Sequence, residues 1–66
     1  MRVLKNFSRV NINTIFRGRK IVLPGKKALT LSNYETDEED RALYAYLTQI
    51  YGFVMDITDR IIKVKN

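Results

Sequence analysis

The stretch TDEEDRALYAYLTQIYGFVMDIT, residues 36–58, constrains the fold more than any other part of the chain. Thr36 followed by Glu39 fits a capping box, the reciprocal pair of hydrogen bonds that begins many helices. Apolar residues then recur at steps of three and four, which is the spacing of one buried helical face; they are Ala42, Leu43, Tyr46, Leu47, Ile50 and Tyr51. Gly52 follows the last of them and would supply the left-handed backbone that commonly ends a helix. The pattern predicts one amphipathic helix over residues 37–51.

Alternating and turn-forming residues predict short strands on both sides of this helix. Alternation predicts a strand over about residues 8–16, and RGRK at 17–20 predicts a hairpin turn in which Gly18 takes a positive φ. The apolar residues of 21–31 continue the sheet around a Pro-Gly turn, and the alternation over 53–58 predicts a further, half-buried strand. Residues 59–66 fit either a short final strand or a tail that orders on a partner.

Short connections favour antiparallel pairing, because a parallel crossover needs a dozen or more residues. The expected fold class is therefore α+β. It consists of a small antiparallel β-sheet of three to five short strands, packed on one face by the amphipathic helix. Closure of the sheet into a small barrel is the variant left open.

Length and composition exclude several classes of function. A chain of 66 residues forms one domain and buries only about 60% of its unfolded surface, so packing or a partner must supply stability. It has no Cys and no His, which argues against disulfides, zinc sites, and thiolate or imidazole catalysis. We therefore expect no enzyme activity, no cofactor and no metal. The sequence also lacks a membrane span and the apolar run of a signal peptide, so we expect a protein that is neither secreted nor in a membrane.

Charge is segregated along the chain, which has a net charge of +5. Residues 1–34 carry only cations, whereas residues 35–40, ETDEED, carry only acids. Three interpretations remain open. The basic half could bind nucleic acid, it could be ordinary solvated strands and loops, or it could complement the acidic run of a neighbouring copy. The acids also suit the positive end of a helix dipole.

Two glycine turns concentrate the cations that are candidates for phosphate contact. RGRK and LPGKK each bring backbone and positive charge to one turn. The candidate residues are Arg17, Arg19, Lys20, Lys26 and Lys27.

Apolar and aromatic residues give a second group of candidate partner contacts. Residues 1–7 hold Leu4 and Phe7 without an obvious partner pattern, so this segment is either an arm that docks on another subunit or an extra edge strand of the same domain. Tyr44 is expected to be exposed on the helix, where tyrosine favours protein contacts. Tyr46 and Tyr51 are expected to complete the core.

The runs FRGRKIVLPGKKALTL and LTQIYGFVMDIT, with an acid-rich helix start between them, resemble small proteins encoded among the virion genes of tailed bacteriophages. The resemblance covers roughly residues 10–58. It implies a virion component of the capsid, neck or tail that acts through protein contacts in the virion or the host cytoplasm, and it transfers no functional residue.

The leading hypothesis is thus a non-enzymatic interaction protein of a phage-like assembly, with other protein subunits as partners in a homo- or hetero-oligomer. One alternative is a small basic nucleic-acid-binding protein or regulator, and another is a small inhibitor that binds a host enzyme. If residues 1–7 are an arm, deleting them weakens assembly and leaves folding intact.

Overall fold

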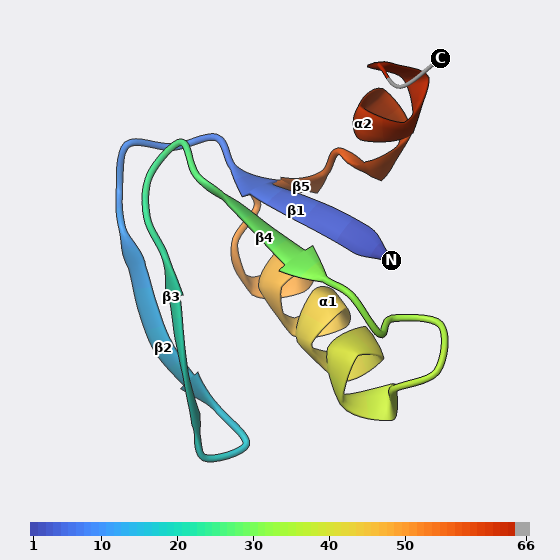
Figure 1. Ribbon diagram of the computed structural model, residues 1–66. Helices are drawn as coiled ribbons and strands as arrows, with labels where there is room; N and C mark the ends of the chain where they lie inside the picture. Colours follow the sequence, from blue (N-terminus) through green and yellow to red (C-terminus); the bar gives the residue numbers. More distant parts are fainter. Residues whose placement is uncertain (65–66) are drawn as a thin grey trace.

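The computed structural model describes residues 1–64, which form five short strands and two helices (Figure 1). In chain order these are β1 Arg2–Asn6, β2 Ile12–Phe16, β3 Arg19–Leu23, β4 Ala28–Leu31, α1 Glu38–Ile50, β5 Val54–Asp56 and α2 Thr58–Val64. Lys65 and Asn66, which belong to the expected final strand or tail, lie outside the described residues.

The strands form two antiparallel sheets. One has the order β4-β1-β5, and the other is the hairpin β2-β3, whose register pairs Ile12 with Leu23 and Phe16 with Arg19. The α+β prediction is confirmed. The sheets do not close into a barrel, because the hairpin bends away from the three-stranded sheet after the β1–β2 loop (Figure 1).

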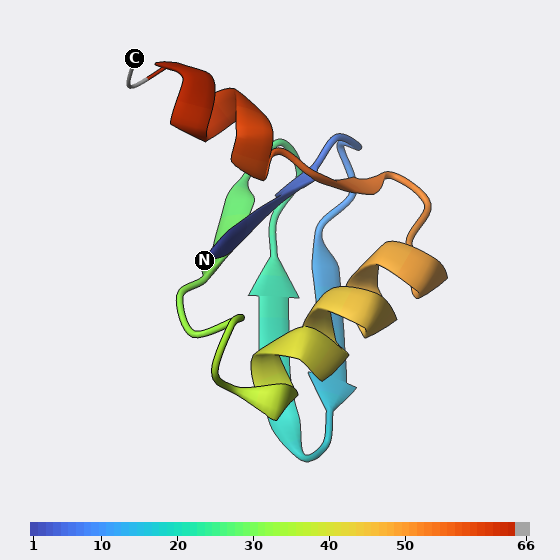
Figure 2. The same ribbon diagram turned by 90° about the vertical axis from the view of Figure 1, so that its right-hand side faces the viewer.

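Both sheets and α1 share one apolar core. α1 lies across the inner face of the hairpin (Figure 2). Leu43 and Leu47 of α1 belong to one buried cluster with residues from all five strands. The buried cluster consists of Leu4, Ile12, Ile21, Leu23, Leu31, Leu43, Leu47 and Val54. Burial of a leucine-sized side chain contributes about 1.5–3 kcal/mol, so this cluster is the main source of stability.

Helix α1 begins and ends close to the predicted bounds, although both predicted caps are wrong. The N-cap is Asp37, whose carboxylate accepts a hydrogen bond from the Glu39 amide at 3.0 Å, in the place predicted for Thr36. At the other end Tyr51 is the C-cap in an extended conformation, and its N–H donates to the Leu47 carbonyl. The helix therefore ends at an extended residue. Gly52 does not adopt the predicted left-handed conformation, since Gly18 is the one glycine of residues 1–64 with positive φ.

The N-terminal segment is the centre of the three-stranded sheet, so the arm hypothesis is wrong. β1 pairs with β4 on one side and with β5 on the other, and Leu4 is 0% exposed in the core. The alternative of an extra strand was correct in kind, but the strand is central and not at an edge. Alternation failed as a signal here because β1 is covered on both faces, so Val3 and Leu4 are both buried.

Strand β2 is shorter than the predicted strand over 8–16. It begins at Ile12, because residues 7–11 form a loop that is held by the side chain of Asn6. The predicted glycine turn at the hairpin tip is present: Arg17 and Gly18 have φ of 53° and 78°, the two positive values of a type I′ hairpin.

The segment after β5 is a helix over the described residues 58–64, so the final strand, one of the two alternatives for residues 59–66, is wrong for that part of the chain. Asp56 accepts hydrogen bonds from the amide and the hydroxyl of Thr58, and the amide of Ile61 then donates to the Ile57 carbonyl. Asp56, two residues before Thr58, is thus the acceptor that directs the chain into α2. This helix packs on the face of β1 opposite α1 (Figure 1). Neither α1 nor the described part of α2 has the length and apolar character needed to cross a bilayer.

Candidate functional site

The hairpin tip presents three of the predicted cations. Arg17 and Arg19 flank the turn glycine, and Lys20 pairs in register with Ile15 on the outer side of the hairpin. All three side chains are exposed.

Acids at the start of α1 pair with the two arginines of this tip. The Arg17 guanidinium lies 3.0 Å from the Glu38 carboxylate, and Arg19 lies 4.0 Å from Glu39. The hydrogen bond to Glu38 and its charge raise the pKa of Arg17. These pairs are solvent-exposed and contribute little to stability. They do show that two arginines of the basic segment meet acids of the acidic segment within one chain, whereas one of the three open interpretations placed this attraction between neighbouring copies.

Lys26 and Lys27 lie at the other end of the hairpin. Their turn packs on the β1–β2 loop: the Lys26 amide donates to the carbonyls of Asn6 and Ser8, and its ammonium donates to the Phe7 carbonyl at 2.6 Å. A five-residue strand at about 3.4 Å per residue separates this turn from the tip by roughly 17 Å. The structure therefore does not bring the five predicted cations together.

The turn residue Gly25 allows these two loops to touch. A Cβ at Gly25 would lie 2.7 Å from the carbonyl carbon of Arg9, a distance that side-chain carbons do not reach. Figure 1 shows the β1–β2 and β3–β4 connections side by side at the end of the molecule opposite the hairpin tip, and Figure 2 shows the same. The Arg9 side chain is exposed, and its backbone contacts Gly25, the residue before the two lysines.

Phe7, a predicted partner contact, is half-buried between two cations. The Lys5 ammonium lies 5.1 Å from the centre of its ring, and the Arg60 guanidinium of α2 lies 5.9 Å away. Cation–π attraction of this kind holds two like charges beside one ring. Leu4, the other apolar candidate, is in the core and unavailable to a partner.

Tyr44 is half-buried and not exposed as predicted. Its hydroxyl donates to the Asp56 carboxylate at 2.8 Å, and the same carboxylate lies 3.2 Å from the Arg2 guanidinium. Tyr46 and Tyr51 pack against the core as expected, and the Tyr46 hydroxyl lies 3.0 Å from that of Thr14.

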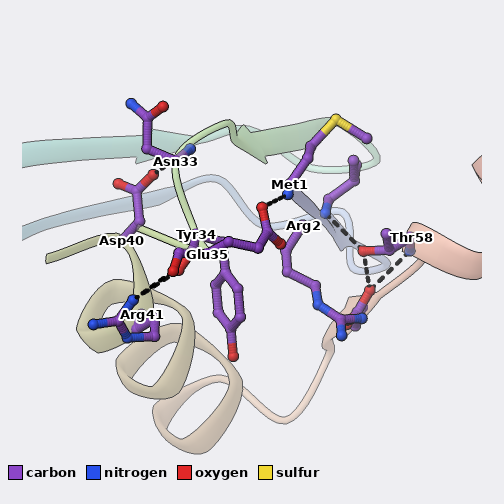
Figure 3. Close-up of polar contacts among 10 residues, drawn as sticks. Met1, Arg2, Asn33, Tyr34, Glu35, Asp40, Arg41 and Thr58 are labelled. Atoms are coloured by element: carbon purple, nitrogen blue, oxygen red, sulfur yellow. Dashed lines mark hydrogen bonds and ion pairs between the residues drawn. The ribbon is translucent and has the colours of Figure 1, made fainter. Parts of the chain in front are cut away.

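Polar contacts fasten β1 to the elements on both sides of it (Figure 3). The Val3 amide donates to the buried hydroxyl of Thr58, while the amino group of Met1 contacts Glu35. In the neighbouring β4–α1 connection the Asn33 amide donates to Asp40, and Arg41 donates to the carbonyls of residues 34 and 35. These hydrogen bonds hold the segments of the fold together.

The Asp56 network changes the ionisation of its members. Partial burial raises the pKa of the Asp56 carboxyl, but hydrogen bonds from Thr58 and Tyr44 and the charge of Arg2 outweigh burial and lower it overall. Burial and the hydrogen bond to Asp56 raise the pKa of the Tyr44 hydroxyl. A Tyr44 that donates to an ionised carboxylate is not poised as a base or a nucleophile. Sequence reasoning missed this network, although the Asp-x-Thr spacing before α2 is a recognisable turn signal.

Asn6, also missed, is fully buried and satisfies all of its hydrogen-bonding groups. Its amide nitrogen donates to the carbonyls of Val10 and Leu23, and its oxygen accepts from the amide and the hydroxyl of Ser8. One side chain thereby holds the β1–β2 loop against the end of the hairpin where β3 ends, opposite its tip.

The outer face of the hairpin is an uncovered surface of mixed character. Ile15 and Val22 are 70% and 48% exposed, whereas Ile12 and Ile21 on the inner face are nearly inaccessible. Register places Lys20 opposite Ile15 and Asn13 opposite Val22, so the two apolar side chains are diagonal neighbours. In the chain as described, neither hairpin strand has a second neighbour.

No pocket and no cluster of three potential metal ligands occurs among the residues described by the structure. Two surface features are candidates for recognition: the outer hairpin face and the adjoining β1–β2 and β3–β4 connections. The chain matches no protein-family model, no curated protein and no solved structure.

Proposed function

We propose that this chain is a non-enzymatic interaction protein that serves as a component of a phage-like virion assembly, in the capsid, the neck or the tail. The observation that carries the proposal is the outer hairpin face. Two β-branched residues, Ile15 and Val22, are exposed there on a sheet of only two strands. A two-stranded sheet is marginal by itself, and its free edges offer main-chain groups to an incoming strand.

The buried polar side chains form hydrogen bonds within the fold, which supports the same proposal. Asn6, Asp40, Thr58 and Asp56 are all tied to neighbours within the fold. None of the buried side-chain nitrogens or oxygens in the part of the chain described lacks a hydrogen-bond partner. The resemblance to virion proteins of tailed phages supplies the kind of assembly, and the partner is accordingly another protein subunit.

Incorporation into purified particles tests the proposal. We expect the chain in density-gradient-purified particles of the genome that encodes it, in a fixed number of copies per particle by quantitative mass spectrometry. Ile15→Lys should abolish incorporation, because the charge would be desolvated in the interface. The matched control is Ile50→Lys, since Ile50 is 62% exposed on α1, away from the hairpin face.

Both variants should melt like the wild type, because each replaces an exposed side chain. Absence of the chain from particles would refute the virion proposal. Equal incorporation of Ile15→Lys and Ile50→Lys would remove the hairpin face as its interface.

A further inference from the structure

We infer that the paired loops at the root of the hairpin form a binding surface for the phosphate backbone of a nucleic acid. We call this surface the loop-end cluster, and it comprises Lys5, Phe7, Arg9, Lys26, Lys27 and Arg60. This set differs from the cations singled out by the sequence, since it leaves out the hairpin tip and adds residues of β1, of the first loop and of α2.

Contacts between four segments bring the cluster together. Gly25 brings the β3–β4 turn onto the Arg9 backbone, and the Lys26 ammonium reaches the Phe7 carbonyl. The Phe7 ring in turn holds the cations of Lys5 and Arg60 within 5.1 Å and 5.9 Å of its centre. Residues up to 55 positions apart in the sequence thus contribute to one charged end of the molecule.

The loop-end cluster contains five cations and no acidic residue. Among the described residues, carboxylates lie within 4.0 Å of Arg2, Arg17, Arg19 and the N-terminus, but of no cation of the loop-end cluster. The hydrogen bond from Lys26 to a carbonyl leaves its charge in place. Five like charges that have no carboxylate of the described residues within 4.0 Å repel one another, and a polyanion would relieve this repulsion.

The chemistry of the cluster favours nucleic acid over other polyanions. Lysine and arginine side chains on adjacent loops suit successive phosphates, whose condensed counterions are released on binding. The half-buried Phe7 ring lies among these cations, and an aromatic side chain within a basic surface is a feature of proteins that bind single-stranded nucleic acid.

The test is fluorescence anisotropy of a labelled 20-nucleotide single strand titrated with the protein at several salt concentrations. Contact with about four phosphates predicts a slope of about −2.8 in the plot of log affinity against log salt. Affinity should then fall about 50-fold between 50 and 200 mM salt.

Two double variants with the same net charge locate the surface. Arg9→Gln/Lys27→Gln and Arg17→Gln/Arg19→Gln each lower the net charge from +5 to +3. The first should weaken binding about tenfold or more and make the salt slope shallower by about 1.4, whereas the second should bind like the wild type. Neither Arg9 nor Lys27 donates a side-chain hydrogen bond in the part of the chain described, so the first variant should fold normally by circular dichroism.

Three results would overturn the inference. Equal loss in both double variants would mean that net charge alone drives binding. Failure of the wild type to bind the strand at 50 mM salt would remove nucleic acid as the ligand. Tighter binding to phosphatidylserine vesicles or to polyglutamate than to the strand, lost in Arg9→Gln/Lys27→Gln, would assign the surface to a membrane or an acidic protein.

Discussion

At the residue scale, single polar side chains determine how the connections run. Asn6 fixes the first loop through four hydrogen bonds, and Asp56 directs the chain into α2 through Thr58. Each makes contacts within a few residues and also with a distant segment. The net stabilisation from each such hydrogen bond is modest. Removing one partner is more costly, because the buried group left without a partner keeps its full desolvation penalty.

Because of Asp56, we expect the free energy of unfolding to depend on pH in the acid range. Its folded-state pKa is lowered, so the carboxylate stabilises the fold above the unfolded-state pKa of about 3.9. That contribution is lost as pH falls through the lower, folded-state value. Asp56→Asn should therefore be less stable than the wild type at pH 6, and the difference in unfolding free energy should shrink as pH falls below about 4.

Urea unfolding of both proteins between pH 6 and pH 2.5 measures this difference. The comparison isolates Asp56, because the rest of the sequence, including Glu35 with its lowered pKa, is the same in both proteins. A difference that stays constant over the whole range would show that ionised Asp56 does not stabilise the fold.

At the element scale, the apolar spacing of the sequence predicted the bounds of α1 but not its N-cap. The apolar spacing predicted the helix to within a residue at each end, because side-chain periodicity is a property of the sequence itself. The predicted N-cap, Thr36, was wrong, because Asp37 is the N-cap. Which residue caps the helix depends on where the β4–α1 connection ends, and here the amides of Thr36 and Asp37 both donate to the Asn33 carbonyl.

The two candidate caps give a direct prediction. Asp37→Ala should lower the stability by about 1 kcal/mol, since it removes the acceptor for the Glu39 amide. In a domain of this size that loss lowers the melting temperature by roughly 4–8 °C. Thr36→Ala should leave the melting temperature nearly unchanged, and the reverse order of the two variants would restore the predicted capping box.

The outer hairpin face was predictable in principle and the loop-end cluster was not. Ile15 and Val22 have the strand parity opposite to Ile12 and Ile21, so their exposure follows once the inner face is known. Lys5, Arg9 and Arg60 lie in three separate segments. Only the pairing of β1 with β5 and the packing of α2 bring Lys5 and Arg60 to the same ring.

At the scale of the whole molecule, the fold depends on its first strand. β1 joins β4 to β5 and contributes Leu4 to the core, so the three-stranded sheet has no other source of pairing at its centre. The domain has a small core for its length, which leaves little margin for such a loss.

Deletion of residues 1–7 should therefore unfold the isolated domain, contrary to the arm hypothesis. We expect loss of the cooperative thermal transition by circular dichroism. A matched pair of point variants refines the result: Leu4→Ala should cost about 2–5 kcal/mol, whereas Lys5→Ala, on the opposite side of the same strand, should cost far less. A deletion variant that still melts cooperatively near the wild-type temperature would show that β1 is dispensable for folding.

By itself the sequence determined the helix, the hairpin with its positive-φ glycine and the α+β class. These follow from periods of 3.6 and 2 residues and from turn chemistry, which act over a few neighbouring positions. The tertiary structure decided the central place of β1, the helical form of residues 58–64 and the pairing of the hairpin arginines with the acids of α1. It also brought the cations of Lys5 and Arg60 to the Phe7 ring. These depend on contacts between residues far apart in the chain, which exist only once the shared core has brought the segments together.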